Sequence, residues 1–321
     1  MDLDITAEQH DLLTLCALRV DGASLDWSLL ARSAQSPDGL AALLEGRLRE
    51  DSRAATKNRP LLQQALDAGV DSARARVDEE LAAAAKAGAR LVTVLDKDYP
   101  ANLRVVGNLP PFLFYRGALD QRDARSIAVV GTRQASEEGL RRAARMAREL
   151  VEHDVVIASG LAKGIDAAAH HATLAAGGRT FAVMGTGIAA PVYPAENRPL
   201  ARAILDAEGA LLSQFWPTSP PAKYTFPRRN VVTSGTTLGS VVIEASHTSG
   251  AKMQARLAAE HGKLVFLIKS LADAQPWAKA MLEEDRAIQV NRSSDITDRL
   301  GQAADIQRAG QQRQQLALAG L

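Results

Sequence analysis

The chain has a single cysteine, Cys16, among its 321 residues. One cysteine excludes an internal disulfide and leaves no cysteine cluster for a structural metal ion. Its neighbours in "LLTLCALRV" are apolar, which indicates a buried thiol rather than a reactive one. We expect neither a bound metal nor a cofactor.

The chain also has almost no net charge and no long apolar run. The 38 Lys and Arg residues balance 37 Asp and Glu residues to a formal charge of +1, so an anion-binding surface must come from local clustering of cations. No apolar run approaches the roughly 18 residues that span a bilayer. The acidic start "MDLDIT" lacks the basic region of a signal peptide. We expect a cytoplasmic protein without membrane contact.

Apolar residues make up 46% of the chain, enough to bury one large domain and a small one. Residues 1–88 have helical periodicity in segments bounded by Ser, Pro or Gly. The first, "TAEQHDLLTLCALRV", opens with Thr6 and Gln9 in capping-box spacing. We predict a small all-helical domain over 1–88, of the SAM or helix-hairpin kind.

After Gly88, short β-branched runs alternate with helical stretches, which is typical of βαβ units and a parallel sheet. The predicted strands are 91–95, 112–115, 126–131, 155–160, 180–185, 210–215, 240–245, 264–268 and 287–290. The predicted helices are 136–153, 164–177, 196–208, 226–235, 249–261 and 276–284. We therefore predict an α/β fold over 89–303, a Rossmann-like, doubly wound, mostly parallel sheet. A Gln- and Ala-rich tail over 304–321 follows it.

Two strand-to-helix loops carry residues suited to an anion. Ligands of open α/β sheets bind beyond the carboxyl ends of the strands. The loop in "VVGTRQAS" supplies Gly131, Thr132 and Arg133. The loop in "ASGLAKGID" supplies Ser159, Gly160, Lys163 and Gly164. Glycine permits close backbone approach and Arg presents a fork to phosphate, but neither loop has the spacing of a P-loop or a dinucleotide fingerprint.

The segment "YTFPRRNVVTSG" (224–235) sets Arg228 and Arg229 in the first turn of a predicted helix. The helix dipole disfavours cations there by roughly 0.3 to 1 kcal/mol unless an anion offsets them. Phe226 offers a ring for a base and Lys223 adds a charge, a combination that resembles a platform for a single nucleic-acid strand. The alternative is that Phe226 is core, both arginines are solvated or paired, and Asn230 is a cap.

Other polar residues favour structural roles. Asp166 lies in the first turn of its helix, where a carboxylate complements the dipole. His170 and His171 are adjacent and face different directions on a helix, so they cannot form an i, i+4 metal pair. Glu244 ends an apolar strand without a second acid placed to work with it. We expect no catalytic residues and no enzymatic activity.

At these motifs the sequence resembles the DNA-processing protein A family, also called DprA or Smf. Its motifs appear in order as "GTR" (131–133), "SGLAKGIDAAAH" (159–170), "YPAEN" (193–197), "FPRRN" (226–230) and "VIEASHTSG" (242–250). The stretch "DKDYPANLRVVGNLPPFLFYRGAL" also resembles the family's entry into its Rossmann-like domain. The resemblance covers about 90–300. Val231 departs from the family's second Arg of "RNR", Gln214 stands where "SE" is usual, and the C-terminal winged helix of many members is missing.

The resemblance implies a homodimeric, non-enzymatic protein that binds and protects single-stranded DNA and loads the RecA recombinase in recombination, natural transformation or a related defence role. It implies a strand-binding segment at Lys223, Phe226, Arg228, Arg229 and Asn230, with Arg133 and Lys163 in the same groove. The full set of expected DNA contacts is Gly131, Thr132, Arg133, Ser159, Gly160, Lys163, Gly164, Lys223, Phe226, Arg228, Arg229, Asn230 and Lys252.

A second class of function stays open, because related Rossmann-like families hold a nucleotide with the same loops. The protein would then be a nucleotide-binding sensor or a nucleotide-cleaving enzyme. An enzyme of that kind needs a PGGxGTxxE loop. The nearest segment, "SGTTLGSVVIE", has different glycine spacing and runs into a strand. A pure interaction scaffold is a third reading.

Overall fold

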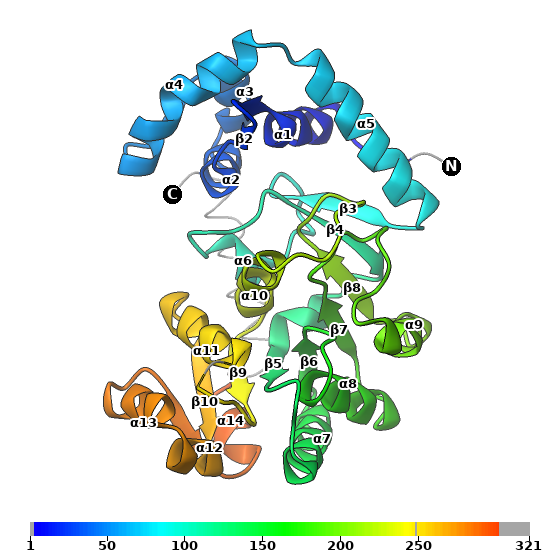
Figure 1. The fold of residues 1–321 in the computed structure, drawn as a ribbon, viewed down its shortest axis with the longest axis vertical. Coiled ribbons are helices and arrows are strands. Elements are labelled where there is room, and N and C mark those ends of the chain that lie inside the picture. The colour runs from blue at the N-terminus through cyan, green and yellow to red at the C-terminus, as the bar shows by residue number, and fades with distance from the viewer. Residues whose placement is uncertain (1–2, 248, 302–321) are drawn as a thin grey trace.

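A computed structural model describes residues 3–247 and 249–301 of the chain. It contains one nine-stranded sheet in the order β11-β10-β9-β5-β6-β7-β8-β4-β3, preceded by a helical segment (Figure 1). The predicted α/β fold with a mostly parallel sheet is confirmed. No helix in the described residues combines the length and apolarity needed to cross a membrane. The predicted tail over 304–321 lies outside the described residues.

The first segment is helical, as predicted, apart from one small hairpin. Its helices are α1 (Ala7–Ala17), α2 (Trp27–Gln35), α3 (Gly39–Leu44), α4 (Arg53–Asp67) and α5 (Asp71–Lys86). The capping box forms at α1. The Thr6 hydroxyl accepts from the Gln9 backbone amide at 3.1 Å, and the Gln9 side-chain oxygen accepts from the Thr6 backbone amide at 2.8 Å. The strands β1 (Arg19–Val20) and β2 (Ala23–Ser24) make the hairpin, which the helical pattern did not predict. Cys16 is buried, and burial raises the pKa of its thiol.

Seven neighbouring strands run parallel at the centre and one side of the sheet. They are β5 (Ser126–Val130), β6 (Val156–Ser159), β7 (Thr180–Val183), β8 (Ala210–Ser213), β9 (Gly239–Val242), β10 (Leu264–Ile268) and β11 (Ile288–Val290). Strands β5 to β9 are buried along their whole length, which explains their uninterrupted apolar sequence. The strands β4 (Phe112–Gly117) and β3 (Arg90–Thr93) are antiparallel and close the other side.

Helices cover both faces of this sheet. The chain moves from β5 to β8 in one direction and then returns to β9, β10 and β11, so right-handed crossovers place the two sets of helices on opposite faces. The first set is α7 (Glu137–Val151), α8 (Ile165–Ala175) and α9 (Arg198–Asp206). The second set is α10 (Thr225–Thr236), α11 (Gly250–Glu260), α12 (Lys269–Ala274) and α13 (Pro276–Glu283). Shorter helices are α6 (Ala101–Arg104), α14 (Ser294–Thr297), η1 (Gln121–Arg125) and η2 (Ala195–Asn197). The order reverses between β5 and β9, where such sheets usually hold their ligand.

The helical segment and the sheet share one apolar core. The ring of Trp27, from α2, lies 5.1 Å from Phe112 of β4 and 5.8 Å from Trp216, measured between centroids. Glu80 of α5 is buried and accepts from the amide and hydroxyl of Thr218 at 2.9 and 2.8 Å. The pattern changes after residue 88 from helices to alternating strands and helices, but the apolar core continues across this point.

Candidate nucleic-acid interface

The two predicted anion loops lie against each other at the carboxyl edge of the sheet. The amide of Thr132 donates to the Glu244 carbonyl at 2.7 Å, and the Ile165 amide donates to the Thr132 carbonyl at 3.4 Å. A Cβ on Gly164 would lie 2.5 Å from the carbonyl oxygen of Thr132, and the φ of this glycine is +74°. Glycine is required at that contact because a side chain would be both strained and obstructed.

Phe226 lies at the centre of this edge, beneath Arg133. The guanidinium carbon of Arg133 is 5.0 Å from the centroid of the half-buried Phe226 ring, within cation–π range. The ring of Tyr193 lies 5.6 Å from that of Phe226. A Cβ on Gly185 would come within 2.7 Å of Phe226, so the strand end after β7 supports the ring closely. Phe226 thus lies between the core and the surface, between the two alternatives that the sequence left open.

Exposed cations also lie at the start of α10, which runs from Thr225, with Lys223 just before the helix and Arg228 at its fourth position. Lys223 and Arg228 are exposed, and the Arg228 guanidinium carbon lies 5.8 Å from the centroid of the Tyr224 ring. Within 3–247 and 249–301, no carboxylate lies within ion-pair distance of Lys223, Arg228 or Arg133. Positive charge therefore gathers at a helix start without local compensation, which is the arrangement that an anion would stabilise.

Arg229 points the other way, into the protein. It is 8% exposed and donates to the Val183 carbonyl at 3.0 Å. Gly160 makes room for it, because a Cβ there would lie 1.4 Å from a guanidinium nitrogen. Burial lowers the pKa of Arg229, while the nearby carboxylate of Asp166 opposes that shift. Arg229 therefore braces α10 against the β6–α8 loop.

Asp166 holds the β6–α8 loop from inside. Its carboxylate accepts from the amides of Gly160 at 3.0 Å and Ala162 at 3.3 Å, in the first turn of α8. Burial raises its pKa, and Arg229 is the main opposing influence. This position agrees with the predicted dipole complement and shows that the carboxylate also fixes the loop.

The remaining predicted contacts lie at different depths. Ser159 and Asn230 are buried, and the Ser159 hydroxyl donates to the Val129 carbonyl at 2.7 Å. Gly131 and Thr132 are partly exposed at the edge. Lys163 is exposed and forms an ion pair with Glu196. Lys252 lies apart from the two loops, on α11.

The usual ligand position of the sheet, between β5 and β9, is occupied by Glu244. Its carboxylate accepts from the Ser136 hydroxyl at 2.6 Å and the Ser136 amide at 3.1 Å, at the start of α7. A Cβ on Gly139 would lie 2.0 Å from this carboxylate. A nucleotide phosphate would normally take this helix N-terminus, so the carboxylate disfavours the nucleotide-sensor alternative.

The family model of DNA recombination-mediator protein A matches residues 90–301. The chain belongs to this family. It is 40% identical over 176 residues to the DNA processing protein DprA of Streptococcus pneumoniae, covering 55% of this chain and 61% of the relative. It spans 47% of the length of the similar protein Smf of Synechocystis sp., at 38% identity over 190 residues and 58% of this chain.

Solved structures of the DprA family share the fold. The DprA of S. pneumoniae matches with a TM-score of 0.70 and 28% identity, over 94% of this chain and all of the other. The DprA of Helicobacter pylori, solved to describe its single-stranded DNA binding mode, matches with a TM-score of 0.57 and 23% identity, over 65% of this chain and 94% of the other.

Two tyrosines of this DprA-family chain lie at the site but were not among the predicted contacts. Tyr193 and Tyr224 are 48% and 65% exposed and flank Phe226 and Arg228. Tyr224 was visible as an aromatic next to "FPRRN". Tyr193 follows β7 by ten residues, and only the folded loop brings its ring to Phe226.

Proposed function

We propose that the protein binds single-stranded DNA across the crest formed by Arg133, Tyr193, Lys223, Phe226 and Arg228. The observation that carries the proposal is Arg133, an exposed cation without a carboxylate partner, placed over the supported Phe226 ring, with the exposed cations Lys223 and Arg228 at the nearby start of α10. Cations that track a backbone and rings that stack on bases are the two components of single-strand binding. Membership of a family of DNA recombination mediators supports the same function.

In this proposal the cations of the crest bind phosphates and its aromatic ring binds a base. Arg133, Lys223 and Arg228 contact phosphates, and Lys163 joins them when it leaves Glu196. A base stacks on Phe226 in place of the Arg133 guanidinium, which then turns to a phosphate. Gly131, Gly160 and Gly164 let the two loops pack closely on Ile165, Arg229 and the Thr132 carbonyl, and this packing fixes the surface that the strand crosses. Thr132 is partly exposed at that surface. The buried residues Ser159, Arg229 and Asn230 form the wall beneath the strand.

We extend the proposal to partners and setting on the basis of the family resemblance. The protein forms a homodimer through its Rossmann-like domain, transfers the strand to the RecA recombinase, turns over no substrate and works in the cytoplasm. Light scattering at tens of micromolar should give the mass of two chains. A monomer alone would contradict the dimer.

One titration tests the proposed ligand. Labelled oligo-dT, its duplex form, mononucleotides and cyclic dinucleotides are compared by fluorescence anisotropy or competition at several salt concentrations. We expect oligo-dT to bind better than duplex, because only unpaired bases offer their faces to Phe226. Equal affinity for duplex, or preference for a small nucleotide, would overturn the proposal.

A further inference from the structure

A groove runs between α10 and α11 beside the crest, with a volume of about 550 Å³. Its apolar lining comes from Pro227 and Val231 on α10 and from Met253 and Leu257 on α11. Each pair is spaced by four residues, so each occupies one face of its helix. Met253 is 47% exposed, so its side chain forms an accessible part of this lining. The groove therefore offers an accessible apolar surface next to Arg228.

Positive side chains border this apolar surface. Arg228, Lys252 and Arg256 all line the groove, and His247 lies there too. None of these three cations has a carboxylate within ion-pair distance among the residues that the structure describes. Glu260 is the one carboxylate in the lining. The groove combines unpaired cations with an apolar floor, a combination suited to a base and its flanking phosphates.

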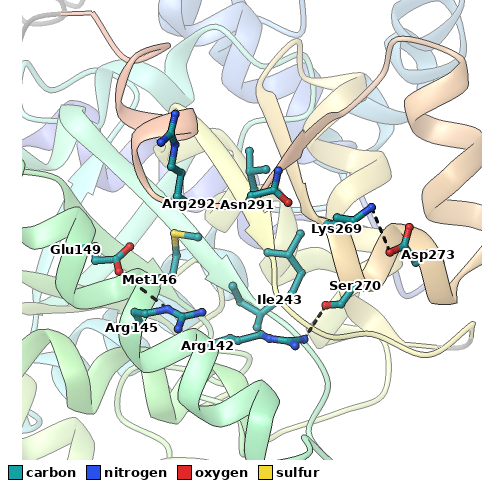
Figure 2. Close-up of a pocket in the computed structure, with 12 residues that line it drawn as sticks. Arg142, Arg145, Met146, Glu149, Ile243, Lys269, Ser270, Asp273, Asn291 and Arg292 are labelled. Carbon is teal, nitrogen blue, oxygen red and sulfur yellow. Dashed lines mark hydrogen bonds and ion pairs between the residues drawn. The ribbon is translucent and has the colours of Figure 1, made fainter.

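A second cationic pocket provides the contrast. It lies beyond β10 and β11, has a volume of about 330 Å³ and is lined by Arg142, Arg145, Lys269 and Arg292 (Figure 2). Here the cations already have partners: Arg145 pairs with Glu149 at 4.0 Å, Lys269 with Asp273 at 3.6 Å, Arg292 with Asp295 at 3.4 Å, and Arg142 with Glu138 at 2.9 Å. An incoming anion would have to displace carboxylates there, whereas the α10–α11 groove imposes no such exchange.

We infer that the α10–α11 groove is a second nucleotide site, which receives the same DNA strand after it crosses the crest. Arg228 belongs to both surfaces and marks the junction between them. One base lies on the floor formed by Val231 and Met253, while Lys252 and Arg256 bind the adjacent phosphates. This inference rests on the proposed single-strand binding and adds a longer footprint with two separable parts.

The test compares oligo-dT of about 4 to about 16 nucleotides on the full-length protein and on the double variant Lys252→Ala/Arg256→Ala. Short oligomers fill the crest alone, so their affinity should not change. Longer oligomers should bind the wild type more tightly, and the double variant should lose this gain. Its salt slope for long oligomers should fall by about 1.4, the value for two lost contacts on a single strand.

Two further variants keep the outcome specific. Met253→Glu places a negative charge at an exposed position of the floor and should weaken long oligomers only. Arg148→Ala removes an exposed cation from α7, on the other face of the sheet, and should change neither. If short oligomers bind but the groove variants bind long ones like the wild type, the second site is overturned. If crest variants leave short-oligomer binding intact, the proposed function itself fails.

Discussion

At the scale of single residues, Arg228 and Arg229 are neighbours in sequence with opposite environments. We expect Arg228→Ala to make the negative slope of log affinity against log salt shallower by about 0.7, because one exposed phosphate contact is lost. The melting temperature should not change. Salt titrations with oligo-dT and thermal melts measure both quantities. A wild-type slope would remove Arg228 from the interface.

Arg229→Met should instead lower stability. The variant keeps most of the side-chain volume but loses the hydrogen bond to the Val183 carbonyl and the charge near Asp166. We expect a loss of about 1 to 3 kcal/mol in the free energy of unfolding, measured by urea denaturation. Stability equal to that of the wild type would show that Arg229 does not brace α10.

Phe226→Ala separates stacking from packing. If a base stacks on the ring, affinity for oligo-dT should fall by about 1 to 3 kcal/mol while the salt slope stays the same, because no charge is lost. Phe226→Tyr retains a ring and serves as the control, with affinity near the wild type. An affinity loss that only accompanies unfolding would assign Phe226 to the core.

The buried ring of His170 should make the stability of the fold depend on pH. Its ring is fully buried, Nδ1 lies 2.7 Å from the Thr180 hydroxyl, and burial, with the nearby charges of His171 and Arg229, lowers its pKa to about 3. The unfolded chain binds a proton below about pH 6.5 that the folded chain does not. Stability is therefore complete above about pH 6.5 and should decline by about 1.4 kcal/mol per pH unit as pH falls toward 3. Denaturation of His170→Gln at several pH values should lack this contribution; an unchanged pH profile would contradict it.

At the scale of elements, the contact between the β6–α8 loop and α10 sets the form of the crest. Gly160→Ala places a Cβ where the Arg229 guanidinium lies, so Arg229 must leave its site. We expect a loss of about 1 to 3 kcal/mol of stability together with weaker DNA binding. Gly107→Ala is the control, because no atom lies within 4 Å of its added Cβ. Equal melting temperatures for the two variants would show that the contact is not tight.

The elements also show how far sequence reasoning reaches. Helix α10 was predicted at 226–235 and spans Thr225–Thr236, because local signals determine where a helix begins and ends. Those signals do not reveal which arginine faces inward, since adjacent helical residues differ by about 100° and the choice depends on Gly160, from another loop. The Tyr193 ring and the α10–α11 groove likewise depend on tertiary packing between distant segments.

At the scale of the whole molecule, the helical segment and the sheet should unfold together. Trp27 joins them through Phe112 and Trp216, and its indole donates to the Cys16 carbonyl at 2.9 Å. We expect Trp27→Ala to lower the unfolding free energy by about 3 to 5 kcal/mol and to leave a single transition. Calorimetry checks both points. Two separate transitions in the wild type would show that the shared core does not couple the two parts.

Glu244 closes the crevice between β5 and β9, so a ligand of this sheet lies across an open edge instead of inside an enclosed pocket. An open edge has no entrance through which an end must be threaded. A strand laid across it can land at any internal position of a long molecule, and circular single-stranded DNA should bind as readily as a linear strand of the same length.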